Sequence, residues 1–226
     1  MSRISTASSV PGRTIVDNDY KKLDNARTNL IVGISGATGA IFGVRLLQEL
    51  QKSEIETHLV VSKWGARTLI HETSYSLEQV QGMATYHYTT HDEGAMISSG
   101  SFLTRGMVVC PCSVRSLAAI AQGHGDTLIH RAADVVLKER RKLVLVVRET
   151  PLSSIHLENM LKLSRMGVVI FPPVPAFYNH PRTIEDIVDQ TVLRVLDQFE
   201  IHLSSGNRWE GNMSPTGIRR RVNSES

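Results

Sequence analysis

The sequence predicts an α/β protein, a three-layer Rossmann- or flavodoxin-like parallel sheet with helices on both faces. Two observations predict it. Short, nearly continuous apolar runs alternate along the chain with segments whose apolar residues recur at helical spacing. The first run, residues 30–34, breaks into a glycine-rich turn at 35–39, and a helical pattern follows. A strand, turn and helix of this kind attract an anion, because backbone N–H groups and the helix N-terminus point toward it.

The other expected elements follow in order. Strands are expected at 56–62, 106–110, 143–147 and 167–171, with Pro111 stopping the third strand of the chain. Helices are expected at 41–52, 64–72, 77–83, 114–121, 128–140, 155–166 and 184–199, the last opened by a capping pair, Thr183 and Asp186. Ile41 and Ile184 are expected to lie on the buried faces of their helices. Residues 85–104 lack a sustained period, which favours a long functional loop.

Length and composition limit the domain organisation and the class of protein. The 226 residues suit one domain at 29–203, with a disordered tail at 1–28 and a second tail at 204–226 that contains Trp209. The net charge of +3 is small for this length, so nucleic-acid binding is not favoured. No apolar run approaches the roughly 20 residues of a membrane span. Cys110 and Cys112 are expected to be free thiols in a reducing compartment.

The turn at 35–39 narrows the choice of ligand. It is not a Walker A loop, because no lysine follows its glycines, and Ser35 stands where G-x-G-x-x-G requires glycine. The order Gly-Ala-Thr-Gly also suits NADP-binding reductases. Against a reductase, no acidic residue for an adenosine ribose follows the second strand, although Lys63 suits a 2′-phosphate, and no Tyr-x-x-x-Lys pair occurs. A mononucleotide such as FMN therefore fits better than a dinucleotide.

Other residues at strand ends leave a functional and a structural interpretation open. Ser113 is either a contact to the flavin or an ordinary helix cap. Arg148 and Glu149 follow the most apolar strand, at the edge where parallel sheets bind ligands. Tyr178, after a proline-rich loop, suits either a site or the core, and Lys138 and Arg194 suit solvated helix surfaces. The scattered histidines do not indicate a metal site, and without a G-x-S-x-G elbow a hydrolase triad is unsupported.

Taken together, a series of ordered motifs resembles the UbiX/Pad family of flavin prenyltransferases, within the flavoprotein class that also holds phosphopantothenoylcysteine decarboxylases. The resemblance runs from about Leu30 to Trp209. The matching stretches are GISGATGA (33–40), ETHLVVSKW (56–64), ISSGSF (97–102), PCS (111–113), RAADVVLKE (131–139), RETPL (148–152), IHLENML (155–161), PPVPAFY (172–178) and RWEG (208–211).

The resemblance implies an activity. Enzymes of this family transfer a dimethylallyl group from dimethylallyl phosphate to N5 and C6 of reduced FMN, without a metal. The product, prenylated FMN, serves a UbiD-type decarboxylase of aromatic or α,β-unsaturated acids. The family also implies a homo-oligomer, a dodecamer with FMN at subunit interfaces.

The resemblance also implies the roles of individual residues. The FMN-binding set is Gly36, Ala37, Thr38, Ser62, Ser113, Val114, Arg115, Ser116 and Arg131. The substrate phosphate is expected to be held by Lys138, Arg148, Tyr178 and Arg194. Two acidic residues, Glu72 and Glu149, are expected near the reacting centre, with Glu149 the better candidate for proton handling. Lys138, Arg148 and Tyr178 thus count with Glu72 and Glu149 as candidate catalytic residues.

Two other activities stay open: a flavin-dependent decarboxylase that acts without a partner, and a non-catalytic flavin carrier. The expected location is the cytoplasm. The mitochondrial matrix is the alternative if the N-terminal tail, with Arg3 and Arg13 and no acid before Asp17, is a transit peptide.

Overall fold

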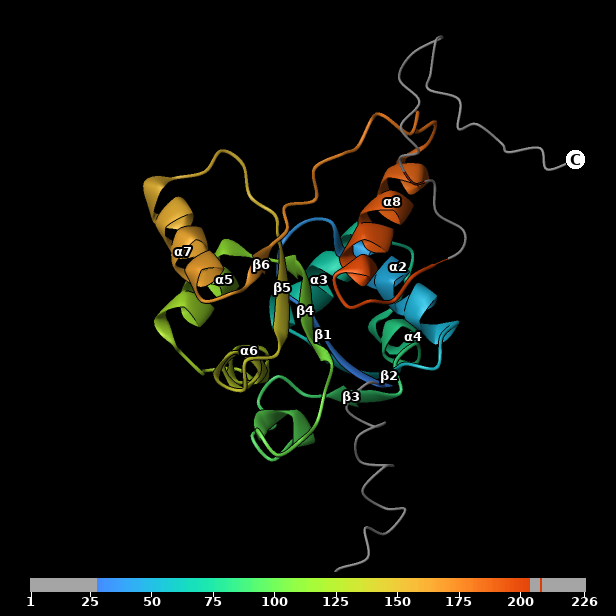
Figure 1. The fold of residues 1–226 in the computed structure, drawn as a ribbon. Coiled ribbons are helices and arrows are strands. Elements are labelled where there is room, and N and C mark those ends of the chain that lie inside the picture. The colour runs from blue at the N-terminus through green and yellow to red at the C-terminus, as the bar shows by residue number, and fades with distance from the viewer. Residues whose placement is uncertain (1–27, 204–207, 209–226) are drawn as a thin grey trace, which may run out of the picture.

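The computed structural model describes residues 28–203 and residue 208. Within this part of the chain, six parallel strands form one sheet in the order β3-β2-β1-β4-β5-β6. Figure 1 shows the strands side by side, with helices on either side of them. The predicted fold class is therefore confirmed. The predicted tails at 1–28 and 204–226 lie outside the described residues, except for residues 28 and 208.

The strands and helices alternate along the chain, as the apolar runs predict. The strands are β1 (Asn29–Ile34), β2 (Glu56–Val61), β3 (Tyr86–Tyr88), β4 (Gly106–Cys112), β5 (Lys142–Val147) and β6 (Val169–Ile170). The helices are α2 (Ala40–Gln51), α3 (Lys63–Glu72), α4 (Leu77–Gln81), α5 (Val114–Gln122), α6 (Leu128–Lys138), α7 (Ser154–Arg165) and α8 (Ile184–Asp197), with a 3₁₀ turn, η1 (Met96–Ser98).

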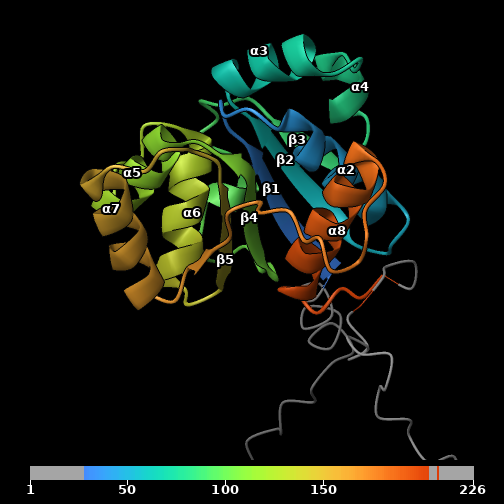
Figure 2. The same ribbon diagram turned by 90° about the horizontal axis from the view of Figure 1, so that it is seen from above.

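The core consists of two apolar layers, one on each face of the sheet. Successive side chains of a strand point to opposite faces. Accordingly Leu30, Val32 and Ile34 pack with α2, α3, α4 and α8, whereas Ile31 packs with α5, α6 and α7. Figure 2 shows these two groups of helices on opposite sides of the sheet. Both layers are buried, which explains why the strands are almost continuously apolar.

The order of the strands reverses between β1 and β4. The chain moves outward from β1 to β2 and β3, then returns to the other side of β1 with β4, β5 and β6. In an open parallel sheet, the crevice at such a reversal, beyond the carboxyl ends of the strands, is the usual ligand site. In this chain those ends carry the glycine-rich turn after β1 and Ser113 after β4.

Two predicted boundaries are wrong. The segment 85–104 is not only loop, since it contains β3 and η1. Strand β3 is three residues long, too short to show a period. Pro111 does not stop β4, which runs to Cys112. The β4–β5 register shifts between Val109 and Cys112, and a proline is tolerated at such an irregularity because no ladder hydrogen bond is required of it.

Two predicted core positions are also wrong. Ile184 is 75% exposed and Ile41 is 37% exposed. Ile184 begins α8, ahead of the buried stretch that starts at Val188, whereas Ile41 is turned away from the face of α2 that buries Gly43, Leu47 and Leu50. The capping pair Thr183 and Asp186 is confirmed as a reciprocal capping box.

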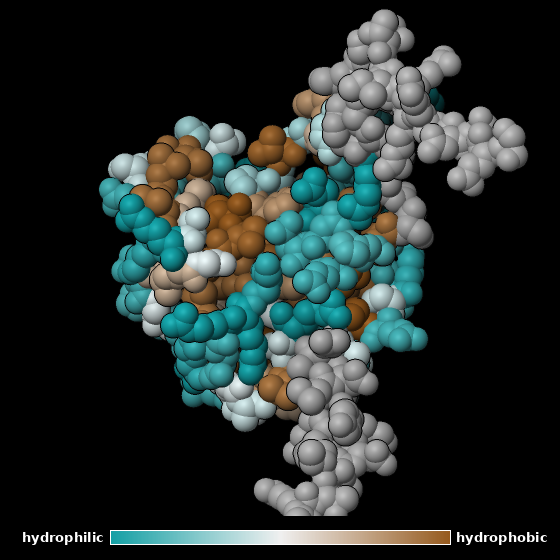
Figure 3. All heavy atoms as spheres, in the orientation of Figure 1, coloured by the Kyte–Doolittle hydropathy of each residue, from teal (hydrophilic) through white to brown (hydrophobic). Residues whose placement is uncertain are grey.

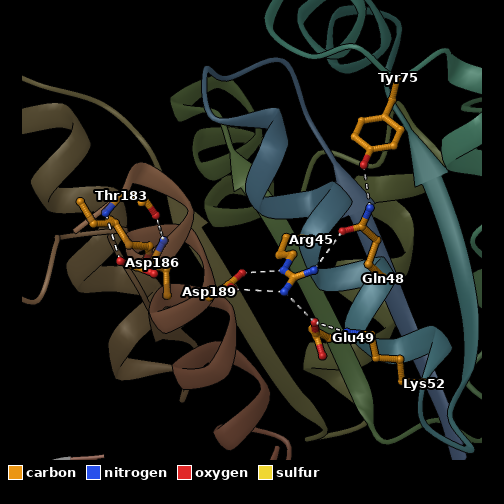
Figure 4. A network of polar contacts seen from close by, with 10 residues as sticks. Arg45, Gln48, Glu49, Lys52, Tyr75, Thr183, Asp186 and Asp189 are labelled. Carbon is orange, nitrogen blue, oxygen red and sulfur yellow. Dashed lines mark hydrogen bonds and ion pairs between the residues drawn. The ribbon is translucent and has the colours of Figure 1, made fainter. Parts of the chain in front are cut away.

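Helices α2 and α8 are joined by a charged network on their exposed side (Figure 4). The Arg45 guanidinium donates to both carboxylate oxygens of Asp189, at 2.5 and 3.1 Å, and forms an ion pair with Glu49 at 3.2 Å. Lys52 contacts the same Glu49 carboxylate at 2.7 Å. The network fixes α8 against α2, and none of the predicted site residues belongs to it.

A buried histidine, His58 on β2, lies among aromatic side chains at the β3 end of the sheet. Its ring stacks on Tyr86 and Tyr88, and Phe102 packs edge-on at 4.8 Å between ring centroids. Its Nδ1 lies 2.8 Å from the Tyr88 hydroxyl, while Nε2 has no partner among the described residues. Burial lowers the pKa of His58 to about 4.

This shift predicts a loss of stability in acid. In the unfolded chain His58 titrates near its usual pKa of about 6.5, so between that pH and about 4 the unfolded state binds more protons. The contribution of neutral His58 is complete above pH 6.5 and is lost as the pH falls toward 4, by about 3 kcal/mol in all. We expect His58→Phe to flatten this part of the stability profile, measured by urea unfolding from pH 7 to 4.5. His87→Gln, an exposed neighbour, should leave the slope unchanged; an unaltered slope in His58→Phe would contradict the assignment.

Candidate functional site

The glycine-rich turn after β1 packs closely against the start of α3. A side chain at Gly36 would place its Cβ 2.4 Å from Cβ of Trp64, so only glycine fits there. Gly39, the N-cap of α2, has a φ of 91°, in the left-handed region that favours glycine. The close packing and the backbone conformation of the turn therefore require the two glycines.

Ser35 links the two strands at the reversal of the sheet. It is 1% exposed. Its amide and its hydroxyl both donate to the carbonyl oxygen of Pro111, at 3.1 and 3.0 Å. The amide of Ser113 donates to Ser35 Oγ at 2.7 Å. The serine that departs from the dinucleotide motif thus holds the start of α5 against the glycine-rich turn.

We expect Ser35→Ala to loosen this junction. The change leaves the Ser113 amide without its acceptor. A buried amide that loses its hydrogen-bond partner lowers the free energy of unfolding by about 1–3 kcal/mol. Chemical denaturation of the variant measures this cost. Ser164→Ala, at an exposed position of α7, is the matched control and should change stability by less than about 0.5 kcal/mol. Equal stability of the two variants would contradict the role of Ser35.

A cavity of about 780 Å³ opens at this junction. Its volume lies within the usual range for small-molecule and cofactor sites. The structure brings most of the predicted FMN-binding residues to its wall, together with Arg148 and Glu149. The residues from the predicted sets that line it are Gly36, Ala37, Thr38, Ser62, Ser113, Val114, Arg115, Ser116, Arg148 and Glu149.

The starts of three helices converge on the cavity. Ser62 caps α3, Ser113 caps α5 and Thr127 caps α6, each by accepting a hydrogen bond from a backbone amide in the first turn. All three capping residues line the cavity. The remaining first-turn amides lack partners within their helices, and the helix dipoles favour negative charge beside them. Hydroxyl and amide donors around a cavity of this volume fit a phosphorylated mononucleotide such as FMN.

Glu72, at the end of α3, caps α2 instead of lining the cavity. Its Oε2 accepts hydrogen bonds from the amides of Gly39 and Ala40, at 2.7 and 3.1 Å. Partial burial raises the pKa of the Glu72 carboxyl, but hydrogen bonds from Thr38 and from the two amides outweigh it, so the net shift is downward. Glu72 is thus an ionised neighbour of Thr38, which does line the cavity.

The other predicted residues lie away from this cavity within one chain. Arg131 lines an adjoining cavity of about 250 Å³, where it donates to the carbonyl of Ser98 and pairs with Asp134. Lys138 lies at the opposite end of α6 from Thr127, about 16 Å along the helix at 1.5 Å per residue, and pairs with Glu139.

Tyr178 and Arg194 also lie outside the cavity wall. Tyr178 is 40% exposed, and its hydroxyl accepts a hydrogen bond from Gln190 at 3.3 Å. Arg194, in the last turn of α8, lies 3.5 Å from Asp197. One chain therefore gathers the predicted flavin-binding residues other than Arg131 with Arg148 and Glu149, but not the other three predicted phosphate ligands.

The cavity also has wall residues that the sequence did not indicate as a site. Thr90 and His91 follow β3, so the missed strand concealed them; placed at a strand end, they would have been candidates. His130 on α6 is a third such wall residue, and nothing in its position within a helix distinguishes it in the sequence. The full list of additional wall residues is Lys63, Trp64, Thr90, His91, Ala119, His124, Asp126, Thr127, Ile129 and His130.

Among the described residues, no group of three or more histidine, cysteine or acidic side chains is arranged to hold a metal ion. Cys110 and Cys112 are buried free thiols. Burial raises the pKa of both, that of Cys112 to about 12, so they are inert rather than nucleophilic. No helix in the described ranges is long and apolar enough to cross a membrane.

Comparison with known proteins agrees with this architecture. Residues 18–196 match the flavoprotein family. A probable UbiX-like flavin prenyltransferase of Bacillus subtilis is 58% identical over 193 residues, which cover 85% of this chain and 95% of the relative. The mitochondrial flavin prenyltransferase PAD1 of Saccharomyces cerevisiae is 57% identical over 182 residues, covering 80% of this chain and 75% of the relative.

Two solved structures are also similar to this chain. The dodecameric FMN-dependent UbiX-like decarboxylase of an Escherichia coli strain superposes with a TM-score of 0.80 at 58% identity, over 81% of this chain and all of that one. AnUbiX, solved with FMN and dimethylallyl pyrophosphate, superposes with a TM-score of 0.81 at 52% identity, over 82% of this chain and 98% of that one.

The parallel sheet and the cavity at its reversal are those of a mononucleotide-binding flavoprotein. The identity and coverage of the relatives allow a narrower assignment than this class. The chain belongs to the flavoprotein family and, within it, to the UbiX-like flavin prenyltransferases. The predicted family and class of enzyme are confirmed.

Proposed function

We propose that this protein transfers a dimethylallyl group from dimethylallyl phosphate to reduced FMN, and that the cavity between β1 and β4 holds the flavin. The observation that carries the proposal is the convergence of three helix starts with Arg148 and Glu149 on one cavity. Relatives named flavin prenyltransferases, and one solved with FMN and dimethylallyl pyrophosphate, support it.

The chemistry requires stabilisation of a leaving anion. The allylic C–O bond breaks with both electrons leaving on phosphate, and new bonds form at N5 and C6 of the flavin, whose reduced ring is the electron-rich acceptor. The hydrogens displaced from N5 and C6 leave as protons; one returns to the allyl double bond and the other protonates phosphate. Arg148 suits the phosphate, and Glu149 suits the proton transfers. Each charge-assisted hydrogen bond to the phosphate contributes roughly 1.5–3 kcal/mol.

We further propose that the chain assembles as a dodecamer in which neighbouring copies complete each site. Lys138, Tyr178 and Arg194, the other proposed phosphate ligands, lie away from the cavity of their own chain. Exposed apolar side chains support an interface: Ile155, Leu157 and Leu161 on α7 and Phe177 in the loop after β6 are each more than half exposed. Hydrophobic residues gather over α7 and beside β6 in Figure 3. The similar E. coli protein is dodecameric.

One experiment separates the three candidate activities. The full-length protein is incubated anaerobically with reduced FMN and dimethylallyl phosphate, and the flavin is analysed by mass spectrometry. We expect the mass of prenylated FMN. An unmodified flavin would contradict the transferase and leave a carrier. Turnover of a cinnamic or hydroxybenzoic acid by the protein alone would instead indicate a decarboxylase, the activity under which the E. coli structure is described.

The product and the cellular location define two further proposals. Prenylated FMN is proposed to pass to a UbiD-type decarboxylase, and activation of such an apo-decarboxylase by the reaction mixture tests this transfer. The cytoplasm is the proposed location. The name of the yeast relative favours testing the mitochondrial alternative, which a fluorescent fusion of residues 1–28 addresses.

A further inference from the structure

A buried histidine on α6 contacts the proposed flavin-binding turn. His130 is 9% exposed and lies in the wall of the cavity. Its Nε2 is 3.3 Å from Oγ of Ser116, in the first turn of α5. Its Nδ1 is buried and has no hydrogen-bond partner among the described residues. A polar ring in this position requires an explanation that helix packing alone does not provide.

The surroundings of its two ring nitrogens decide which nitrogen of His130 carries the proton. Were the proton on Nδ1, a buried N–H would have no acceptor, and such orphaned donors are rarer than bare acceptors. We therefore assign the proton to Nε2, which donates to Ser116 Oγ. The Ser113 hydroxyl also donates to Ser116 Oγ, at 3.3 Å.

This arrangement leaves the Ser116 hydroxyl one direction in which to donate. A serine oxygen accepts two hydrogen bonds and donates one. Because His130 and Ser113 occupy both acceptor positions, the Ser116 proton points away from them. Ser116 lines the cavity, beside the first-turn amides of α5. An acceptor oxygen of a mononucleotide is the ligand chemistry that this donor fits.

The charge state of His130 is compatible with this role. Burial lowers its pKa; Asp126 raises it, and Arg115 and His124 lower it further, so the net shift is downward. A neutral ring donates from one nitrogen only. The Ser116 hydroxyl thus keeps a fixed direction at neutral pH.

We propose that His130 is a positioning residue for FMN: its Nε2–H donates to Ser116 Oγ and turns the Ser116 hydroxyl proton toward the bound mononucleotide. This inference rests on the proposed function, since it requires FMN in the cavity. It adds His130 to the residues proposed to bind or position FMN.

The test measures FMN affinity, by quenching of flavin fluorescence, in the full-length chain freed of flavin. We expect His130→Leu and Ser116→Ala each to weaken FMN binding roughly tenfold. The double variant should bind no more weakly than either single one, because each single change already removes the hydrogen bond between His130 and Ser116 that directs the Ser116 hydroxyl. His130→Gln, whose amide can still donate to Ser116, should stay within about threefold of wild type. His87→Leu, at an exposed position of β3, is the matched control.

Three results would overturn the positioning role: wild-type affinity in His130→Leu, additive losses in the double variant, or a loss in His130→Gln equal to that in His130→Leu. Either of the last two would indicate packing alone. Failure of the wild-type chain to bind FMN would overturn the proposed function, and this inference with it. Thermal unfolding of every variant identifies a loss of affinity that follows from misfolding.

Discussion

Glu149→Gln is expected to retain FMN and to slow formation of prenylated FMN by two orders of magnitude or more. Glu149 follows β5 and lines the cavity beside Arg148. One of its carboxylate oxygens accepts the amide of Thr150 at 3.1 Å, which fixes the side chain at the strand end. Glutamine keeps the shape and this acceptor but cannot exchange a proton. A positioned acid–base group contributes typically 10²–10⁴-fold to the rate.

The measurement is a single turnover with reduced FMN under anaerobic conditions, with product followed by mass. FMN affinity is measured on the same preparation, so that a binding defect is distinguished from a slow chemical step. Glu56→Gln, at the exposed start of β2, is the matched control and should react at the wild-type rate. A wild-type rate in Glu149→Gln would exclude Glu149 from proton transfer and direct attention to Glu72, the other predicted acidic residue, and to Asp126 in the cavity wall.

The sequence predicts the layers of this fold well, because β1, β4 and β5 are buried on both faces and appear as continuous apolar runs. It misses β3, whose three residues are too few to show a period. That omission hides Thr90 and His91, which lie in the cavity wall only because a strand ends before them. In the sequence Ser35 stands out only as a departure from a motif. Its hydrogen bonds to Pro111 and Ser113 join residues 76 and 78 positions apart, which no local pattern reveals.

The predicted residues of the candidate site fall into two groups, one that the strand ends bring together and one that they do not. Residues directly after strands, from Gly36 to Glu149, meet at one edge because parallel strands end together. Lys138 and Arg194 lie within helices, and Tyr178 lies far along the loop after β6, so the fold of one chain does not bring these three residues to the cavity. Their predicted role rests on family resemblance, and it is compatible with the structure if a second chain supplies them.

A mixed assembly tests whether neighbouring chains share one site. Lys138→Met and Glu149→Gln, each alone, are expected to lower the rate by two orders of magnitude or more: the first removes a proposed phosphate ligand, the second the proposed proton-transfer group. In a dodecamer that contains both kinds of chain, some sites receive Glu149 from one chain and Lys138 from its neighbour. Random mixing in equal amounts gives about a quarter of such intact sites, and hence about a quarter of the wild-type rate.

The two variants carry different affinity tags and are co-expressed, purified over both tags in succession, and quantified by mass spectrometry before the assay. Glu149→Gln mixed with Arg148→Met is the matched control. Both of those residues line the cavity of the same chain, so every site in that mixture keeps a defect and activity should stay low. If the Lys138→Met mixture also stays inactive, Lys138 acts on the site of its own chain. Recovery in that mixture alone would assign Lys138 to the neighbour's flavin, because only a site built from two chains can combine one intact residue from each.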